Sequence, residues 1–188
     1  MRIRRLILAS ASPRRARILE GLGVAFKVRP AHADETLLVG ERPIAAVRRL
    51  AKLKVRTVAR RSDEGVLAAD TVVVLGSRIL GKPRTRAEAR SMLRSLSGRP
   101  HVVATGVALA WGRTMATAVD QTEVRFRRID RAEIARYVRS GEPLDKAGAY
   151  HIEGGGASFI ESISGSPSNV AGLSVTTARR LLKRAGIL

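Results

Sequence analysis

Residues 65–83, GVLAADTVVVLGSRILGKP, decide the fold that we predict for this chain. Residues 66–69 and 72–75 are apolar with no polar alternation, which predicts a buried strand. Asp70 and Thr71 interrupt this strand, and the turn Gly81-Lys82-Pro83 follows it. A carboxylate in an apolar strand is costly unless it is paired, metal-bound or used in chemistry. The alternative is an aspartate at a tight strand-to-strand turn, and this segment alone leaves both interpretations open.

The composition of the 188 residues indicates one soluble globular domain, 1–188, large enough for a proper core. No apolar run approaches the roughly 20 residues of a transmembrane helix, so we expect no membrane association. The start MRIRRLILAS is too short in its apolar part, and too closely followed by arginines, for a signal peptide. Zero cysteines exclude disulfides, thiolate metal sites and a cysteine nucleophile, and favour a cytoplasmic location.

The formal net charge of +19 raises the question of a nucleic-acid partner. The excess is almost all arginine and is spread along the chain, and aromatic residues make up only 3% of it. Few aromatic side chains are therefore present on which bases could stack. We expect no nucleic-acid partner, whereas the charge is compatible with a small phosphorylated ligand.

Two helices predicted in the first third of the chain carry basic side chains in unusual places. A strand is predicted at 4–9, and Ser12-Pro13 then predicts the start of a helix with Ser12 as its cap. Arg14 and Arg15 fall in the first turn of this helix, where their positive charges oppose the helix dipole. Free amides and two guanidiniums suit a phosphate, although the arginines could simply be solvated. In the helix from Pro43 to about residue 59, Lys54 falls on the inward stripe, either at its edge or in a site. That stripe also contains Ile44, Val47, Ala51 and Val58.

The rest of the chain alternates strands and helices. We predict strands at 24–28, 101–111, 114–126 and 158–163, and helices at 86–96, from Asp130 to Gly141, and from Ser174 onward. His101 is expected to be exposed. The loop at 141–165 is rich in glycine and could approach a ligand closely or be a plain connection. Asp34 and Glu35, in the loop after 24–28, are either solvated or metal ligands.

Seven segments, in order and nearly end to end, resemble the Maf family of nucleoside triphosphate pyrophosphatases. These are LILASASPRRARIL (6–19), ADET (33–36), RLAKLKV (49–55), AADTVV (68–73), GKP (81–83), SMLRSLSGR (91–99) and EPLDKAGAY (142–150). The resemblance implies an α/β fold with a mixed sheet flanked by helices, two lobes around a central cleft, and often a homodimer. It also implies hydrolysis of a nucleoside triphosphate to the monophosphate and pyrophosphate with a divalent cation, Mg²⁺ or Mn²⁺.

The resemblance also assigns expected roles to residues of this chain. Asp70 matches the proposed proton acceptor, and with Glu35 it could hold the metal, because carboxylate oxygens suit hard ions. Arg14, Thr71 and Glu153 match positions associated with substrate choice. The other polar positions expected to bind substrate are Ser10, Arg15, Lys54, Lys82, Asp145 and Lys146.

Glu153 departs from the dTTP/UTP branch of the family, which usually has glutamine there together with the arginine and threonine seen as Arg14 and Thr71. An ionised glutamate only accepts hydrogen bonds, which favours a base with two donors such as guanine, and glutamate occurs in the 7-methyl-GTP branch. Arg14 and Thr71, two of the three positions, favour dTTP or UTP as the substrate. The sequence also leaves a modified nucleotide open as an alternative substrate. A second hypothesis is a nucleotide- or nucleic-acid-binding regulator of cell division without turnover, since the family has been linked to septum formation.

Overall fold

The computed structural model describes residues 5–188, so Arg4, the first residue of the predicted strand 4–9, lies outside the described residues. The strands are β1 (Arg5–Leu8), β2 (Phe26–Val28), β3 (Glu64–Leu75), β4 (Arg78–Leu80), β5 (Pro100–Trp111), β6 (Thr114–Phe126) and β7 (Ile160–Ser164). The helices are α1 (Pro13–Gly21), α2 (Pro43–Thr57), α3 (Arg86–Leu96), α4 (Arg131–Arg139), α5 (Pro167–Val170) and α6 (Val175–Arg184), with short 3-10 turns at Ala147–Ala149 and Gly155–Phe159.

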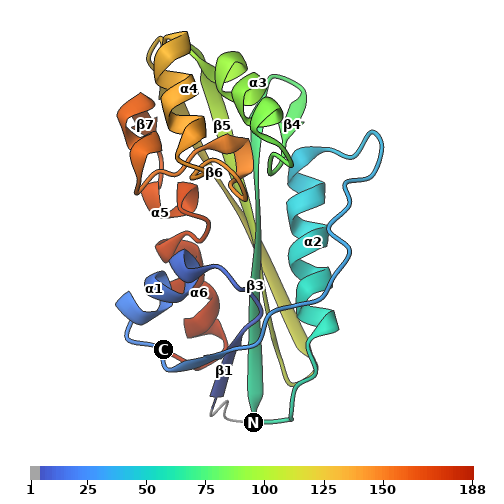
Figure 1. The fold of residues 1–188 in the computed structure, drawn as a ribbon. Coiled ribbons are helices and arrows are strands. Elements are labelled where there is room, and N and C mark those ends of the chain that lie inside the picture. Colours follow the sequence, from blue (N-terminus) through green and yellow to red (C-terminus); the bar gives the residue numbers. More distant parts are fainter. Residues whose placement is uncertain (1–4) are drawn as a thin grey trace. The chain divides into compact units, whose positions relative to one another are not determined.

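The strands form one mixed sheet of seven in the order β2-β1-β3-β5-β6-β7, with β4 paired to β3. β1 pairs in parallel with both β2 and β3, whereas β4 is antiparallel to β3 and β7 is antiparallel to β6. The predicted fold class, an α/β protein with a mixed sheet flanked by helices, is confirmed. The 65–83 segment supplies β3, β4 and the turn that follows them (Figure 1).

The chain divides into two compact units, and the long strands β3, β5 and β6 contribute residues to both. Unit 1 takes in the chain up to Asp70, Thr105–Asp120 and Gly172–Leu188; unit 2 takes in Thr71–Ala104 and Gln121–Ala171. The predicted organisation as one domain with two lobes stays a prediction.

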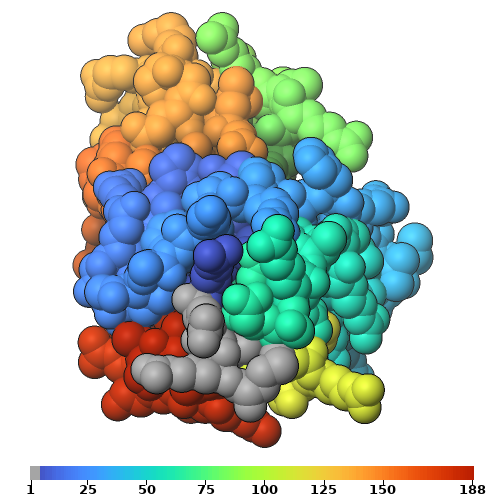
Figure 2. Space-filling model, turned by 90° about the horizontal axis from the view of Figure 1, so that it is seen from below, coloured from blue at the N-terminus to red at the C-terminus, as the bar shows by residue number. Residues whose placement is uncertain are grey.

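In unit 1, helices cover the strands on both faces because the side chains of β1 and β3 alternate between two cores. Leu67 and Ala69 pack with Leu19 of α1 and Leu181 of α6, whereas Val66 and Ala68 pack with Val55 of α2. Figure 1 shows α1 and α6 on one side of β1 and β3, and α2 on the other. Figure 2 shows the segment between β2 and α2 (blue) beside α2 (teal).

The backbone of α2 lies directly against β5 at Gly106. A Cβ added at this glycine would lie 2.5 Å from the carbonyl carbon of Val47 and 2.9 Å from the amide nitrogen of Arg48. These distances are far inside van der Waals contact, so only glycine allows the helix to approach this closely. Gly106 therefore fixes the position of the helix that carries Lys54.

Unit 2 has its own core, in which α3 and α4 pack against the sheet (Figure 1). Leu93 and Leu96 of α3 and Ile134 and Val138 of α4 are all buried there. The predicted capping box at the start of α4 is confirmed, because the Asp130 side chain accepts from the Glu133 amide and the Glu133 side chain accepts from the Asp130 amide.

Three expectations about local structure are wrong, and one short helix was missed. Ser12 is the residue before α1 but its side chain makes no capping bond; its amide instead donates to Oγ of Ser10 at 3.2 Å. Ile44 is 37% exposed because it precedes the stretch of α2 that faces the sheet. His101 is buried, at 2% exposure, between the rings of Phe126 and Tyr150. The short helix α5 was not predicted, because four residues carry no periodicity.

Among the helices of residues 5–188, none is long and apolar enough to cross a membrane.

Candidate active site

Asp70 lies within strand β3 and forms an ion pair with Lys54 of α2. Alternate side chains of a strand point to the same face of the sheet. Asp70 therefore points to the same face as Val66 and Ala68, which is the face covered by α2. Lys54 Nζ donates to Asp70 Oδ1 at 2.6 Å, and each side chain is only 8% exposed. The interpretation of Asp70 as a turn residue is therefore wrong. Lys54 is buried against Asp70 rather than lying at the edge of its helix stripe, and its role in a site stays a prediction.

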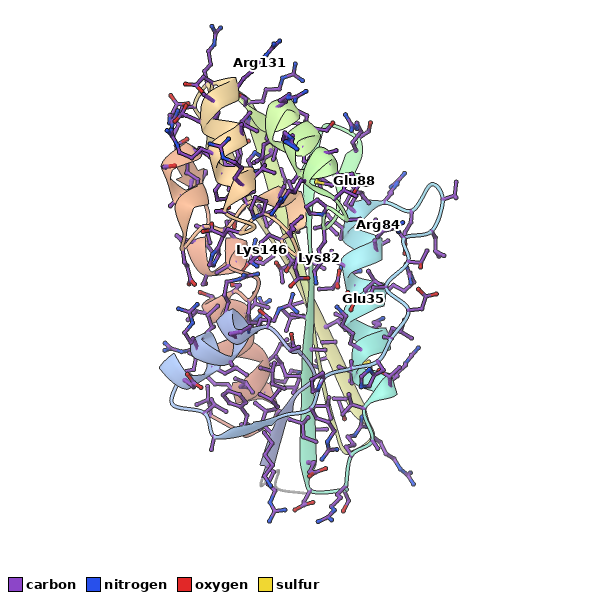
Figure 3. All side chains as sticks on the ribbon, in the orientation of Figure 1. Glu35, Lys82, Arg84, Glu88, Arg131 and Lys146 are labelled. Atoms are coloured by element: carbon purple, nitrogen blue, oxygen red, sulfur yellow. The ribbon has the colours of Figure 1, made fainter. Side chains whose placement is uncertain are left out.

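Glu35 reaches the same ammonium from the loop that precedes α2 (Figure 3). Its Oε2 lies 2.8 Å from Lys54 Nζ, and its side chain is 47% exposed. One ammonium thus bridges two carboxylates, one buried and one facing solvent. Arg15 also interacts electrostatically with both carboxylates, so the two acids face two cations, Lys54 and Arg15.

Arg15 belongs to the same electrostatic environment. Its Nε donates to the carbonyl oxygen of Gly172 at 2.8 Å, and its Nη1 donates to Oγ of Ser10 at 3.1 Å. Burial lowers the pKa of Arg15, and Asp70 acts in the opposite direction. The positive charge of Arg14, the preceding residue in the first turn of α1, also lowers the pKa of Arg15.

Glu35 and Asp70 are the carboxylates that could hold a divalent metal in unit 1. Within residues 5–188 there is no group of three or more His, Cys, Asp or Glu side chains placed to hold a metal ion. Mg²⁺ in phosphate-transferring sites is commonly bound by one or two carboxylates, with substrate phosphate oxygens and water completing its shell. The two acids bridged by Lys54 fit that donor set.

Unit 2 contains a second group of predicted site residues around the turn after β4. Lys82 Nζ lies 2.8 Å from Asp145 Oδ1, with the side chains 59% and 76% exposed. Asp145 has φ 67°, a conformation that a non-glycine residue rarely adopts, and Lys146 follows it directly. The amide of Gly148 donates to the carbonyl oxygen of Gly81 at 3.0 Å, which ties the two segments together. Figure 3 shows Lys82 and Lys146 in this unit.

The remaining predicted residues of unit 2 are Thr71 and Glu153. Thr71 follows Asp70 in β3 and is partly exposed. Glu153 is exposed, and its Oε2 lies 3.8 Å from Nε2 of His151. The structure thus brings Ser10, Arg15, Glu35, Lys54 and Asp70 together in unit 1, and Lys82 with Asp145 in unit 2.

Two residues with a structural part in this region were missed by sequence reasoning. Glu142 and Tyr137 hold the glycine-rich loop that carries Glu153, so this loop is not a plain connection. Glu142 is the first residue of the EPLDKAGAY segment and lies 12 residues before the three glycines at 154–156.

The fold and these groups define an α/β protein with a lysine-bridged acidic centre in one unit and a basic, exposed group in the other. The model of the Maf family, described as "Maf-like protein", matches residues 5–185. The chain belongs to the Maf family.

Several proteins of similar sequence are described as dTTP/UTP pyrophosphatases. The chain is 53% identical to the dTTP/UTP pyrophosphatase of Anaeromyxobacter dehalogenans (strain 2CP-C), over 97% of this chain and 94% of that protein. It is 51% identical to the dTTP/UTP pyrophosphatase of Myxococcus xanthus (strain DK1622), over 97% and 93% of the two chains. Among solved structures, the Staphylococcus aureus Ham1 protein is similar with a TM-score of 0.46 and 14% identity, over 65% of this chain and 72% of that chain.

Proposed function

We propose that this chain is a nucleoside triphosphate pyrophosphatase that hydrolyses its substrate to the monophosphate and pyrophosphate, with dTTP and UTP preferred. The observation that carries the proposal is the ammonium of Lys54 between the carboxylates of Asp70 and Glu35. Relatives about half identical over nearly the whole chain are dTTP/UTP pyrophosphatases, which supports the same chemistry here.

Asp70 is the proposed proton acceptor. Hydrolysis between the α and β phosphates needs a positioned water and charge stabilisation more than covalent chemistry. Asp70 orients or deprotonates that water, and Lys54 fixes the carboxylate through a 2.6 Å hydrogen bond. Because Asp70 is buried and held on a strand, the position of its oxygen is set before substrate binds.

Glu35 and Asp70 are the proposed ligands of Mg²⁺ or Mn²⁺. When bound, the divalent ion supplies positive charge to the phosphate oxygens and favours ionisation of a bound water. The two carboxylates bridged by Lys54 support cation binding, because carboxylate oxygens are the ligands that these hard divalent ions prefer. The half-exposed Glu35 is the ligand more accessible to an ion arriving from solvent.

The cationic residues are proposed to bind the triphosphate. Arg14 and Arg15 begin α1, where free amide groups and the helix dipole also favour an anion. In unit 2, the exposed ammonium of Lys82 is held by Asp145, and Lys146 adjoins it. Ser10 supports Arg15 through a hydrogen bond at 3.1 Å and is the remaining member of the proposed substrate-binding set.

Arg14, Thr71 and Glu153 are proposed to choose the base. Glutamate at 153 accepts but does not donate, whereas uracil and thymine present both an acceptor and a donor. Two of the three positions and the names of the relatives support the pyrimidine triphosphates. A homodimer and a cytoplasmic location remain predictions.

A substrate screen tests the proposal. The purified chain is incubated with dTTP, UTP, GTP and 7-methyl-GTP in Mg²⁺ or Mn²⁺, and the products are identified as monophosphate and pyrophosphate or otherwise. We expect release of pyrophosphate, fastest from dTTP and UTP. The variant Glu153→Gln is expected to change the order of preference; an unchanged order would mean that residue 153 does not read the base. Absence of turnover with every triphosphate would contradict the proposed function.

A further inference from the structure

The loop of residues 151–156 folds around a single carboxylate, that of Glu142. Oε1 of Glu142 accepts from the Tyr137 hydroxyl at 2.8 Å and from the Gly156 amide at 3.4 Å. Oε2 accepts from the Gly155 amide at 3.2 Å. One side chain thus satisfies two backbone donors of a loop that forms no strand or α-helix of its own.

Tyr137 attaches this arrangement to the core of unit 2. Its hydroxyl also accepts from the His151 amide at 3.0 Å, so it holds the first residue of the loop. Its ring packs edge-on against that of Phe159, with centroids 5.0 Å apart, just beyond the last residue of the loop. His151, at the start of the loop, and Phe159, three residues beyond its end, therefore both contact Tyr137, whose ring belongs to the core of unit 2.

The glycines of the loop are required by the closeness of this packing. A Cβ on Gly154 would lie 2.6 Å from Oε1 of Glu142, and one on Gly156 would lie 2.7 Å from the amide nitrogen of His151. A side chain at Gly156 would overlap the backbone of His151, and one at Gly154 would displace the Glu142 carboxylate from its hydrogen bonds. The segment is consequently a preorganised support rather than a flexible connection.

The protonation states agree with this hydrogen bonding. Burial tends to raise the pKa of Glu142, but hydrogen bonds from Tyr137, Gly155 and Gly156 lower it further than burial raises it. Burial and the hydrogen bond to Glu142 raise the pKa of Tyr137. An ionised carboxylate therefore accepts from a protonated phenol across the neutral pH range.

The loop carries Glu153, and His151 lies between the two glutamates. Nδ1 of His151 is 3.9 Å from Oε1 of Glu142, and its Nε2 is 3.8 Å from Oε2 of Glu153. We propose that Glu142 is a positioning residue for base selection: it sets the place and orientation of Glu153 by holding loop 151–156 and His151. This inference rests on the proposed function, which assigns base choice to Glu153.

Glu142 acts through the loop rather than on the nucleotide. Its two oxygens already accept three hydrogen bonds within unit 2, and its side chain is 29% exposed against 42% for Glu153. Loss of its accepting capacity should therefore change which base is preferred more than it changes the chemical step.

Binding of non-hydrolysable α,β-methylene analogues of UTP and GTP, measured by calorimetry, tests the inference. The variants are Glu142→Gln, Glu153→Gln and their combination, with Glu161→Gln as a control that removes an exposed carboxylate of the same unit. Glu142→Gln is expected to change the ratio of the two dissociation constants by about fivefold or more. Glu153→Gln should change this ratio less when it is introduced into the Glu142→Gln variant than when it is introduced into the wild type. Amide hydrogen exchange at 151–156 should accelerate. The control should leave the ratio and the exchange as in the wild type.

An unchanged ratio in Glu142→Gln, or strictly additive effects in the double variant, would overturn the inference even if thermal stability fell. If Glu142→Gln does not fold, Tyr137→Phe removes two hydrogen bonds of the same network and should move the ratio in the same direction. Wild-type binding without base preference would overturn the inference, while pyrophosphate release would still support the proposed function. Selective binding without turnover of the natural triphosphates would contradict the proposed function and leave the inference standing.

Discussion

Lys54 Nζ lies 2.6 Å from Asp70 Oδ1, and both side chains are almost completely buried. Removing one member of a buried ion pair is costly because the other charge remains without its partner in a medium that solvates it poorly. Lys54 also contacts Glu35, so the three side chains act as one group.

Lys54→Met should lower both stability and activity. It leaves the buried Asp70 carboxylate without its ammonium, which should reduce the free energy of unfolding by about 3–5 kcal/mol. Urea denaturation at neutral pH measures the change. Lys52→Met, two residues earlier on α2 and partly exposed, is the matched control. A loss no greater than that of the control would argue against a structural role for the buried pair.

Glu35→Gln should alter the metal requirement while leaving the fold almost unchanged. Its ion pair with Lys54 is half-exposed, so the loss of stability should stay within about 1 kcal/mol. The concentration of Mg²⁺ that gives half-maximal turnover should rise by about tenfold or more, since one oxygen ligand is weakened. Metal titration of pyrophosphate release measures this, with Glu20→Gln on the exposed face of α1 as control. Identical titration curves would remove Glu35 from the ligand set.

The buried His101 should make the fold sensitive to acid. Burial lowers the pKa of His101 from 6.5 to about 4, so between these values the unfolded chain binds a proton that the folded chain does not. The stability contributed by the neutral ring is therefore complete above pH 6.5 and is lost as the pH falls towards 4. The total is on the order of 3 kcal/mol.

Denaturation in urea at several pH values measures this dependence on acid. His101→Phe should flatten the decline between pH 6.5 and 4, although it also removes the partner of the Tyr150 hydroxyl, 3.0 Å away. An equally steep decline in that variant would mean that other groups cause the acid sensitivity.

Gly106→Ala should displace the helix that carries Lys54. Its Cβ would overlap the backbone of α2 at Val47, and overpacking of this kind costs about 1–3 kcal/mol. Turnover should fall with stability because the ammonium moves relative to Asp70. Gly21→Ala serves as control, since a Cβ there meets nothing within 4 Å. Equal thermal stability of the two variants would show that α2 adjusts without strain.

The order and type of the main elements could be predicted because their signals are local. Apolar continuity identified β3, and helix periodicity gave α3 its bounds, Arg86–Leu96. Burial that depends on partners remote in the sequence could not be predicted. His101 is covered by Phe126 and Tyr150, which lie 25 and 49 residues further along the chain.

The chemistry of the candidate site was predictable in its parts but not in its pairing. An acid in an apolar strand and a lysine on the inward stripe of a helix each indicate an unusual environment. Neither pattern indicates which residue will form the ion pair with it. The shared ammonium of Lys54 depends on how closely α2 packs on the sheet, which Gly106 determines. The role of Glu142 could not be predicted because two of its hydrogen bonds come from backbone amides. Every residue except proline has such an amide, so the sequence does not indicate which ones a side chain will contact.

Pyrophosphate release by Asp70→Asn, compared with the wild type on dTTP and UTP in saturating Mg²⁺, tests the central claim most directly. We expect turnover to fall by about a thousandfold or more, because the amide cannot accept a proton from water. The circular dichroism spectrum should be retained, since Glu35 still pairs with Lys54. Asp63→Asn, just before β3, should behave as the wild type. Near-normal turnover by Asp70→Asn would contradict the account.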